Sequence, residues 1–142
     1  MFRCIFLCLV LLGAGCSSVN GPVVSLPSGA RVQVQIADDQ FERMRGLSGT
    51  TSLEQNEGLL FLHESKEIQH YWMKDMLIPI DIIWIDGNEV AGFVEEAQPQ
   101  EPPLTIYSSP VPVDKVLEVS SGFVEENGLK VGDILDIELL NE

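Results

Sequence analysis

Residues 71–86, YWMKDMLIPIDIIWID, are the densest patch of apolar and aromatic side chains after the N-terminus, and they decide the fold. Successive side chains of a β-strand point to opposite faces, so a strand over residues 78–86 would be apolar on both. One face would carry Ile80, Ile82 and Trp84, and the other Pro79, Ile83 and Ile85, with Asp81 among them. A strand of this kind is typical of the centre of a sheet that is covered on two sides. We therefore expect the remaining elements to pack around it.

Short apolar or alternating runs recur on both sides of this central strand. They predict further strands at residues 23–26, 31–36, 58–62, 90–94, 104–107, 113–119 and 134–140. The acidic, proline-rich residues 95–103 cannot sit inside a sheet and are expected to form an exposed loop. The sequence thus predicts an α+β fold that is predominantly antiparallel β, a compact single-domain barrel-like sheet with two short helices.

The first helix is predicted between two terminal signals. Asp39 is a suitable N-cap, Gly46 a suitable stop, and Phe41, Met44 and Leu47 recur at helical spacing. A second short helix is expected at residues 121–127, because a glycine follows at position 128.

The composition is that of one acidic domain. A chain of 142 residues has the common size of a single domain. Its 22 acidic and 8 basic residues give a formal net charge of −14. Nucleic-acid binding requires a cationic face, so no nucleic-acid partner is expected. All three cysteines fall in the first sixteen residues, which excludes a disulfide within the predicted domain.

The first fifteen residues have the pattern of a secretory signal peptide. A basic start at Arg3 is followed by an apolar run over residues 4–12 and by small residues before Cys16. The run is too short for a spanning helix, which needs about 20 residues. Residues 12–16, LGAGC, resemble the lipobox of bacterial lipoproteins, although Gly13 stands where Leu is usual. The other interpretation is ordinary cleavage after Gly15, which leaves Cys16 as a thiol.

The lipobox resemblance implies a location and a partner. It implies acylation of Cys16 and a membrane partner reached through that lipid anchor, with residues 16–22 as the lipidated cysteine and tether. Ser17 after the cysteine, in place of Asp, implies the outer membrane of a bacterial cell envelope, facing the periplasm. The folded domain would then comprise residues 23–142.

The chain also resembles the domain-of-unknown-function 192 (DUF192) family. The resemblance is carried by residues 42–47 (ERMRGL), 58–61 (GLLF), 72–81 (WMKDMLIPID), 107–108 (YS) and 116–118 (VLE). The family usually has Met in place of Ser48, Asn-Thr in place of Asp75 and Met76, and Met in place of Leu59. The family implies a small β-rich, barrel-like fold, often behind a signal peptide, and no established activity.

Asp81 is the most informative polar residue, because its predicted strand is buried on both faces. An unpaired buried carboxylate costs several kcal/mol, so Asp81 should have a cation or several N–H donors as partners. The candidates are Lys74, Arg43, and the backbone amides of residues 75–78. In the functional interpretation, Trp72, Lys74, Asp81 and Arg43 form the rim of a polar pocket with an aromatic wall, suited to a small polar or sugar-like ligand.

No catalytic residue, cofactor or metal site is predicted. The Gly46-Leu47-Ser48-Gly49 run lacks the spacing of a nucleophile elbow. His63 and His70 are seven residues apart, which is wider than common metal-ligand motifs.

Three functions remain open at this stage, and so does the oligomeric state. The first is a lipid-anchored, extracytoplasmic, non-catalytic binding or interaction module for a small polar ligand or an envelope protein. The second is a hydrolase-type enzyme with Asp81 as general base and Lys74 as its electrostatic partner. The third is a purely structural envelope protein that is recognised through its acidic loop.

Overall fold

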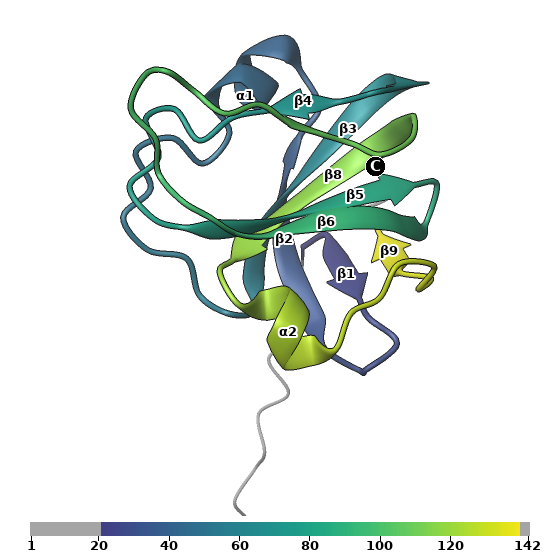
Figure 1. The fold of residues 1–142 in the computed structure, drawn as a ribbon. Helices are drawn as coiled ribbons and strands as arrows, with labels where there is room; N and C mark the ends of the chain where they lie inside the picture. The colour runs from purple at the N-terminus through teal and green to yellow at the C-terminus, as the bar shows by residue number, and fades with distance from the viewer. Residues whose placement is uncertain (1–20, 140–142) are drawn as a thin grey trace, which may run out of the picture.

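The computed structural model describes residues 21–139, so the predicted signal peptide and Cys16 lie outside the described residues. Its strands are β1 (Val23–Ser25), β2 (Arg31–Ala37), β3 (Glu57–Glu67), β4 (His70–Tyr71), β5 (Ile80–Asp86), β6 (Glu89–Ala97), β7 (Tyr107–Ser108), β8 (Val113–Ser120) and β9 (Asp136–Glu138). Its helices are α1 (Gln40–Arg45) and α2 (Phe123–Asn127). Seven strands form one sheet in the order β6-β5-β8-β3-β2-β1-β9, and β4 pairs with β7 in a second, two-stranded sheet. The large sheet curls into a half-barrel, with α1 and β4 at one end and α2 at the other (Figure 1).

The prediction of a central strand is confirmed by β5. It lies between β6 and β8, pairs antiparallel with both, and is buried from Ile80 to Ile85. Its two faces belong to different apolar clusters. Ile83 and Ile85 join the cluster that contains Phe123 of α2, whereas Ile82 and Trp84 join the other. Burial of each of these side chains stabilises the fold by about 2 kcal/mol, so β5 links both halves of the core.

The terminal signals of both helices also act as the sequence predicts. The carboxylate of Asp39 accepts a hydrogen bond from the Glu42 amide at 2.8 Å, and Gly46 caps the C-terminus of α1 with φ +50°. Gly128 ends α2 in the left-handed conformation. The predicted fold class, an α+β domain of mainly antiparallel strands with two short helices, is therefore confirmed.

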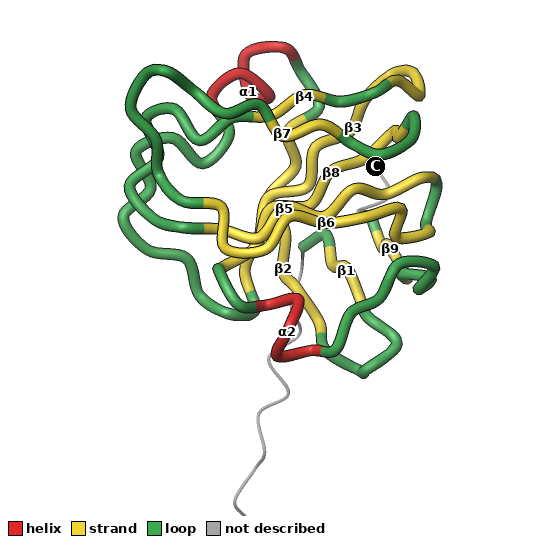
Figure 2. The backbone as a smooth tube through the Cα atoms, viewed as in Figure 1, coloured by secondary structure: helices red, strands yellow, loops and turns green. Residues whose placement is uncertain are grey.

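Some details differ from the sequence prediction. β2 and β3 pair in parallel, because α1 and the loop after it return the chain to the end of the sheet where β2 begins, so that β3 runs in the same direction. β6 continues to Ala97, which is buried, so the exposed loop begins later than expected (Figure 2). The spacing of Phe41 and Met44 does not reflect burial, since both side chains are 74% exposed and α1 buries no residue.

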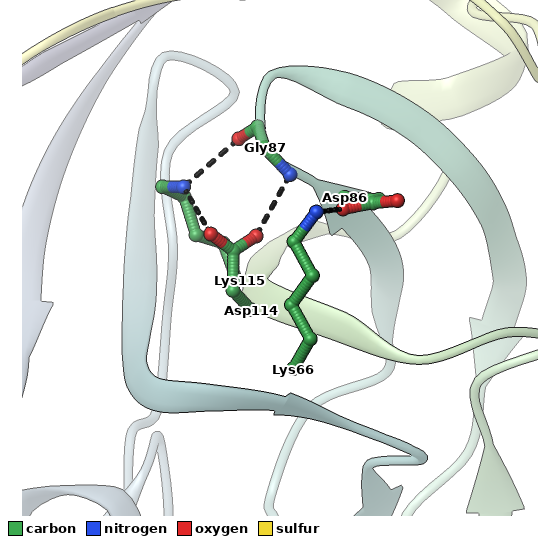
Figure 3. Close-up of polar contacts among 5 residues, drawn as sticks. All are labelled: Lys66, Asp86, Gly87, Asp114 and Lys115. Carbon is green, nitrogen blue, oxygen red and sulfur yellow. Dashed lines mark hydrogen bonds and ion pairs between the residues drawn. The ribbon is translucent and has the colours of Figure 1, made fainter.

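A polar network fixes the turn between β5 and β6 (Figure 3). The Gly87 amide donates to Asp114 at 2.8 Å, and the Lys115 ammonium donates to the Gly87 carbonyl and the Asp114 carboxylate, each at 2.9 Å. Lys66 forms an ion pair with Asp86 beside it. Burial tends to raise the pKa of Asp114, but the bonds from Lys115 and Gly87 outweigh it and lower that pKa below its usual value. Lys66 and Lys115 are thus both paired with acidic side chains of the scaffold.

Candidate functional site

Asp81 serves the scaffold and lies apart from the other predicted site residues. It is fully buried. Its Oδ1 accepts hydrogen bonds from the amides of Glu96 (2.8 Å) and Gly122 (3.2 Å), and its Oδ2 accepts one from the amide of Val124 (2.9 Å). The side chain therefore ties β5 to β6 and to the first turn of α2. This corrects the expected partners: neither Lys74, nor Arg43, nor an amide of residues 75–78 contacts the carboxylate.

The other three predicted residues, Arg43, Trp72 and Lys74, do line a common cavity. It has a volume of about 270 Å³ and is formed by α1 and the turn after it, by β3, by the segment around β4, and by β8. The cavity lies on the face of the sheet that carries Trp84 and Phe61, whereas Asp81 points to the opposite face with Ile83 and Ile85. The structure thus brings together three of the four residues and excludes Asp81. Ligand binding by the three stays a prediction.

Unpaired cations gather at this cavity. Residues 21–139 contain seven Lys and Arg side chains, and three of them form ion pairs: Arg31 with Glu138, Lys66 with Asp86, and Lys115 with Asp114. Four cations in the same range have no acidic partner within 4.0 Å, namely Arg43, Arg45, Lys74 and Lys130. The first three of these four line the cavity. In a chain with a net charge of −14, three positively charged side chains without an acidic partner are thus concentrated at one cavity.

Arg43 is held in place by the backbone. Its Nη1 donates to the Leu62 carbonyl at 2.9 Å and also to the Asp38 carbonyl. Both acceptors are neutral, so the positive charge is oriented without being compensated. The remaining N–H groups of the guanidinium are available to a bound molecule.

Glu118 is the functional candidate that sequence reasoning missed. It lies on β8, lines the cavity and is only 6% exposed. Its Oε2 has no hydrogen-bond partner among the described residues. Burial raises the pKa of Glu118 to about 8, so the side chain is mainly a neutral carboxylic acid at pH 7. It is also the only acid among the described residues that line the cavity.

A signal for Glu118 was present in the sequence. Residues 116–119 read VLEV, and a side chain at position 118 must share the face of Val116, which is fully buried. The argument applied to Asp81, an acid inside an apolar strand, therefore holds for Glu118 as well. The two acids occupy opposite faces of the sheet and differ in one respect: the oxygens of Asp81 have three partners, while Oε2 of Glu118 has none.

Aromatic rings form one wall of the cavity. Tyr71 packs edge-on against Phe61 and Trp84, at centroid distances of 5.0 and 5.5 Å, and its hydroxyl lies 3.1 Å from Nε2 of His63. Burial, followed by the nearby Glu118, raises the pKa of Tyr71 above its usual value. Trp72 beside it is 51% exposed. The wall offers a rigid apolar surface together with a neutral hydroxyl group.

The pKa of His63 is lowered below its usual value, which favours the neutral form. Burial is the main cause, and the positive charge of Arg43 is the second. His63 therefore presents a neutral imidazole at pH 7 and adds no further charge to the cavity.

The segment that carries Trp72 and Lys74 is held by its backbone. Lys74 forms an isolated parallel bridge with Gln100, the Gln100 amide donates to the Met73 carbonyl at 3.2 Å, and the Gly49 amide donates to the Asp75 carbonyl at 3.0 Å. Asp75 has φ +58°, a left-handed conformation that Asn and Asp tolerate better than most residues.

Neither a metal-binding cluster nor a membrane-spanning helix is found in the described part of the chain. Within residues 21–139, no group of three or more His, Cys, Asp or Glu side chains is arranged to hold a metal ion. Over the same range, no helix has the length and apolar character needed to cross a bilayer.

Comparison with known proteins agrees with this fold. The chain is similar to a crystal structure of a protein of unknown function from Novosphingobium aromaticivorans, with 28% identity and a TM-score of 0.75 over 82% of this chain and 83% of that one. It is also similar to a crystal structure of a proposed transcription regulator from Sinorhizobium meliloti, with 28% identity and a TM-score of 0.74 over 82% of this chain and 91% of that one. A search of curated proteins found no match. The sequence profile of DUF192, described as "Uncharacterized ACR", matches residues 23–137, and the chain therefore belongs to the DUF192 family.

Proposed function

We propose that this protein is a lipid-anchored, extracytoplasmic binding module that holds a small polar ligand in the cavity between α1, β4 and β8. The observation that carries the proposal is the convergence of three unpaired cations, an exposed tryptophan and an unpartnered buried acid on one cavity of about 270 Å³. Small-molecule sites are typically clefts of about 300–1,000 Å³ with a few convergent polar groups, and this cavity lies just below the lower end of that range.

The geometry favours binding over the hydrolase alternative. That alternative used Asp81 as general base, but Asp81 is fully buried, accepts three backbone hydrogen bonds and does not line the cavity that contains Lys74. A general base must reach the proton that it removes, so Asp81 does not fit the role.

A purely structural role is also less well supported. Leaving a buried carboxyl oxygen unpaired costs about 1–3 kcal/mol, and an apolar residue at position 118 would avoid that cost. Groups that lower stability without a structural benefit are typical of functional sites.

The anchor and location rest on the sequence. Residues 1–16 have the signal-peptide and lipobox pattern, and Cys16 would carry the lipid. Several acyl chains give stable attachment where one does not. The test is mass spectrometry of the mature N-terminal peptide: acyl groups on Cys16 are expected, and an unmodified Cys16 thiol after cleavage would exclude the anchor.

No transcriptional role is proposed for this chain, although the similar Sinorhizobium meliloti protein is described as a proposed transcription regulator. A net charge of −14 disfavours binding to the phosphate backbone of nucleic acids.

The binding proposal is tested by thermal unfolding of the mature protein, purified in detergent, with a panel of sugars, organic acids, organic phosphates and neutral amides. A ligand at ten times its Kd adds about 1.4 kcal/mol to the free energy of unfolding. That corresponds to a rise in Tm of about 4–6 °C for a domain of this size.

Two substitutions separate pocket binding from unspecific effects. Trp72→Ala is expected to abolish the rise in Tm, because it removes the exposed wall of the cavity. Ile134→Ala is the matched control, because Ile134 is similarly exposed and does not line this cavity. A panel without any effect, or an effect that is equal in both variants, contradicts the proposal.

A further inference from the structure

We infer that the ligand of this cavity is a small organic anion whose carboxylate or phosphate group lies against Arg43, Arg45 and Lys74 and accepts a hydrogen bond from Glu118. This inference rests on the proposed function and names the class of ligand for the same site. Four features of the cavity support it.

The first feature is the charge of the lining. Arg43, Arg45 and Lys74 contribute three positive charges, and none of them has an acidic partner within 4.0 Å in residues 21–139. Glu118 is the one acid among the described lining residues, and it is neutral at pH 7. A neutral sugar would leave these cations uncompensated, whereas an anion would complete the site.

The second feature is the unsatisfied oxygen of Glu118. A protonated carboxyl group has one O–H to donate, and Oε2 has no acceptor among the described residues. The oxygen of a bound carboxylate or phosphate would accept this hydrogen bond. Oε2 is itself buried, so the Glu118 carboxyl group must turn toward the cavity to make this bond; Gly46 carries no side chain beside it, and a Cβ atom there would lie 3.9 Å from Oε2.

The third feature is the apolar part of the lining. Phe61, Tyr71, Trp72, Met44 and Met76 all border the cavity. An inorganic anion would leave the exposed side chains among them, Met44 and Trp72, in contact with water, but a ring or an apolar body attached to the anionic group would cover them. The ligand is therefore an organic anion and not a simple ion.

The fourth feature is the predicted pH dependence of the charge at Glu118, which depends on the other ionisable groups that line the cavity. They are Arg43 and Arg45 from α1 and the turn after it, His63 from β3, His70 and Tyr71 from β4, and Lys74. The pKa of His63 is lowered and that of Tyr71 is raised, so both stay neutral between pH 7 and 9. Over this range Glu118 is the group expected to gain a negative charge, which would repel a bound anion.

The experiment compares three probes of similar shape: benzoate, phenyl phosphate and the neutral benzamide. Binding to the mature protein is measured by isothermal titration calorimetry at pH 7 and constant ionic strength. Benzoate or phenyl phosphate is expected to bind at least tenfold more tightly than benzamide. Lys74→Gln should weaken the binding of the anion about three- to tenfold, as expected for one lost charge contact. Lys130→Gln, which removes an unpaired cation outside the cavity, should leave it unchanged.

A pH series provides the second test. If the anion binds only when Glu118 is protonated, a pKa of about 8 gives about tenfold weaker binding at pH 9 than at pH 7. Glu118→Gln keeps a neutral donor at that position and should bind equally at both values of pH. If the variant does not fold, the pH profile of the wild-type protein still decides the point, because binding that does not weaken toward pH 9 contradicts the role of Glu118.

The outcomes separate this inference from the proposed function. Tight binding of benzamide or of a neutral sugar, with no preference for anions, overturns the inference and leaves a binding function in place. Binding of anions that is insensitive to Lys74→Gln also overturns it. If no probe and no member of the wider panel binds, both proposals fail.

Discussion

The replacement of Asp81 by Asn should destabilise the fold strongly, although the two side chains have nearly the same shape. The carboxylate accepts three backbone hydrogen bonds, two at Oδ1 and one at Oδ2. In Asn the single carbonyl oxygen can keep the amides of Glu96 and Gly122. The NH₂ group would then face the amide of Val124, donor against donor.

The size of the effect follows from these contacts. One hydrogen bond to a charged group contributes about 1.5–3 kcal/mol, and the unpaired, buried Val124 amide adds a further cost, so we expect a loss of about 3 kcal/mol. For a domain of this size the Tm should fall by about 10–15 °C. Chemical denaturation followed by tryptophan fluorescence measures the same free energy, because Trp84 lies in the core.

Asp133→Asn is the matched control for Asp81→Asn. Asp133 also accepts a backbone amide, from Lys130 at 2.9 Å, but at an exposed turn, so Asp133→Asn should cost less than about 1 kcal/mol. If Asp81→Asn unfolds at the same temperature as the wild-type protein, Asp81 does not clamp β5, β6 and α2 together.

Three further predictions concern the cavity and the helix beside it. Burial raises the pKa of Glu118 from 4.5 to about 8, so between these pH values the folded protein binds one proton more than the unfolded chain. The free energy of unfolding should therefore fall by about 1.4 kcal/mol for each pH unit in this range. Urea unfolding at several values of pH should show this slope in the wild-type protein relative to Glu118→Gln, and equal slopes in the two proteins would contradict it. Gly46→Ala should lower the free energy of unfolding by about 1–3 kcal/mol, because Gly46 has φ +50° and ψ −137°, a region disfavoured for other residues, and an unchanged Tm would count against the strain. Asp39→Ala removes the cap of the Glu42 amide and should cost about 1 kcal/mol by thermal unfolding; an unaltered protein would show that α1 does not depend on its cap.

The fold was largely accessible from the sequence because its signals are local. The alternation of residues 78–86 depends only on the geometry of a strand, and the caps at Asp39 and Gly46 act within one turn of α1. The parallel pairing of β2 and β3 was not predicted, although the helix between them was a signal, since parallel neighbours require a crossover connection.

The site was less accessible because its contacts are distant in the sequence. The donors to Asp81 lie 15, 41 and 43 residues away, so no local pattern could identify them. Nor did local periodicity show that α1 would leave Phe41 in solvent, because the apolar spacing of a short helix does not reveal whether a partner surface exists. Glu118 was within reach of the argument used for Asp81, and only the structure shows which of the two faces the cavity.

The most direct test of a ligand site at the cavity is a crystal structure of the protein grown with 4-bromobenzoate, whose bromine atom gives an anomalous signal. We expect that signal beside the Trp72 and Tyr71 rings, with the carboxylate against Lys74 and Glu118. A cavity that stays empty at millimolar concentrations of the compound, or a bromine signal found elsewhere on the protein, would contradict it.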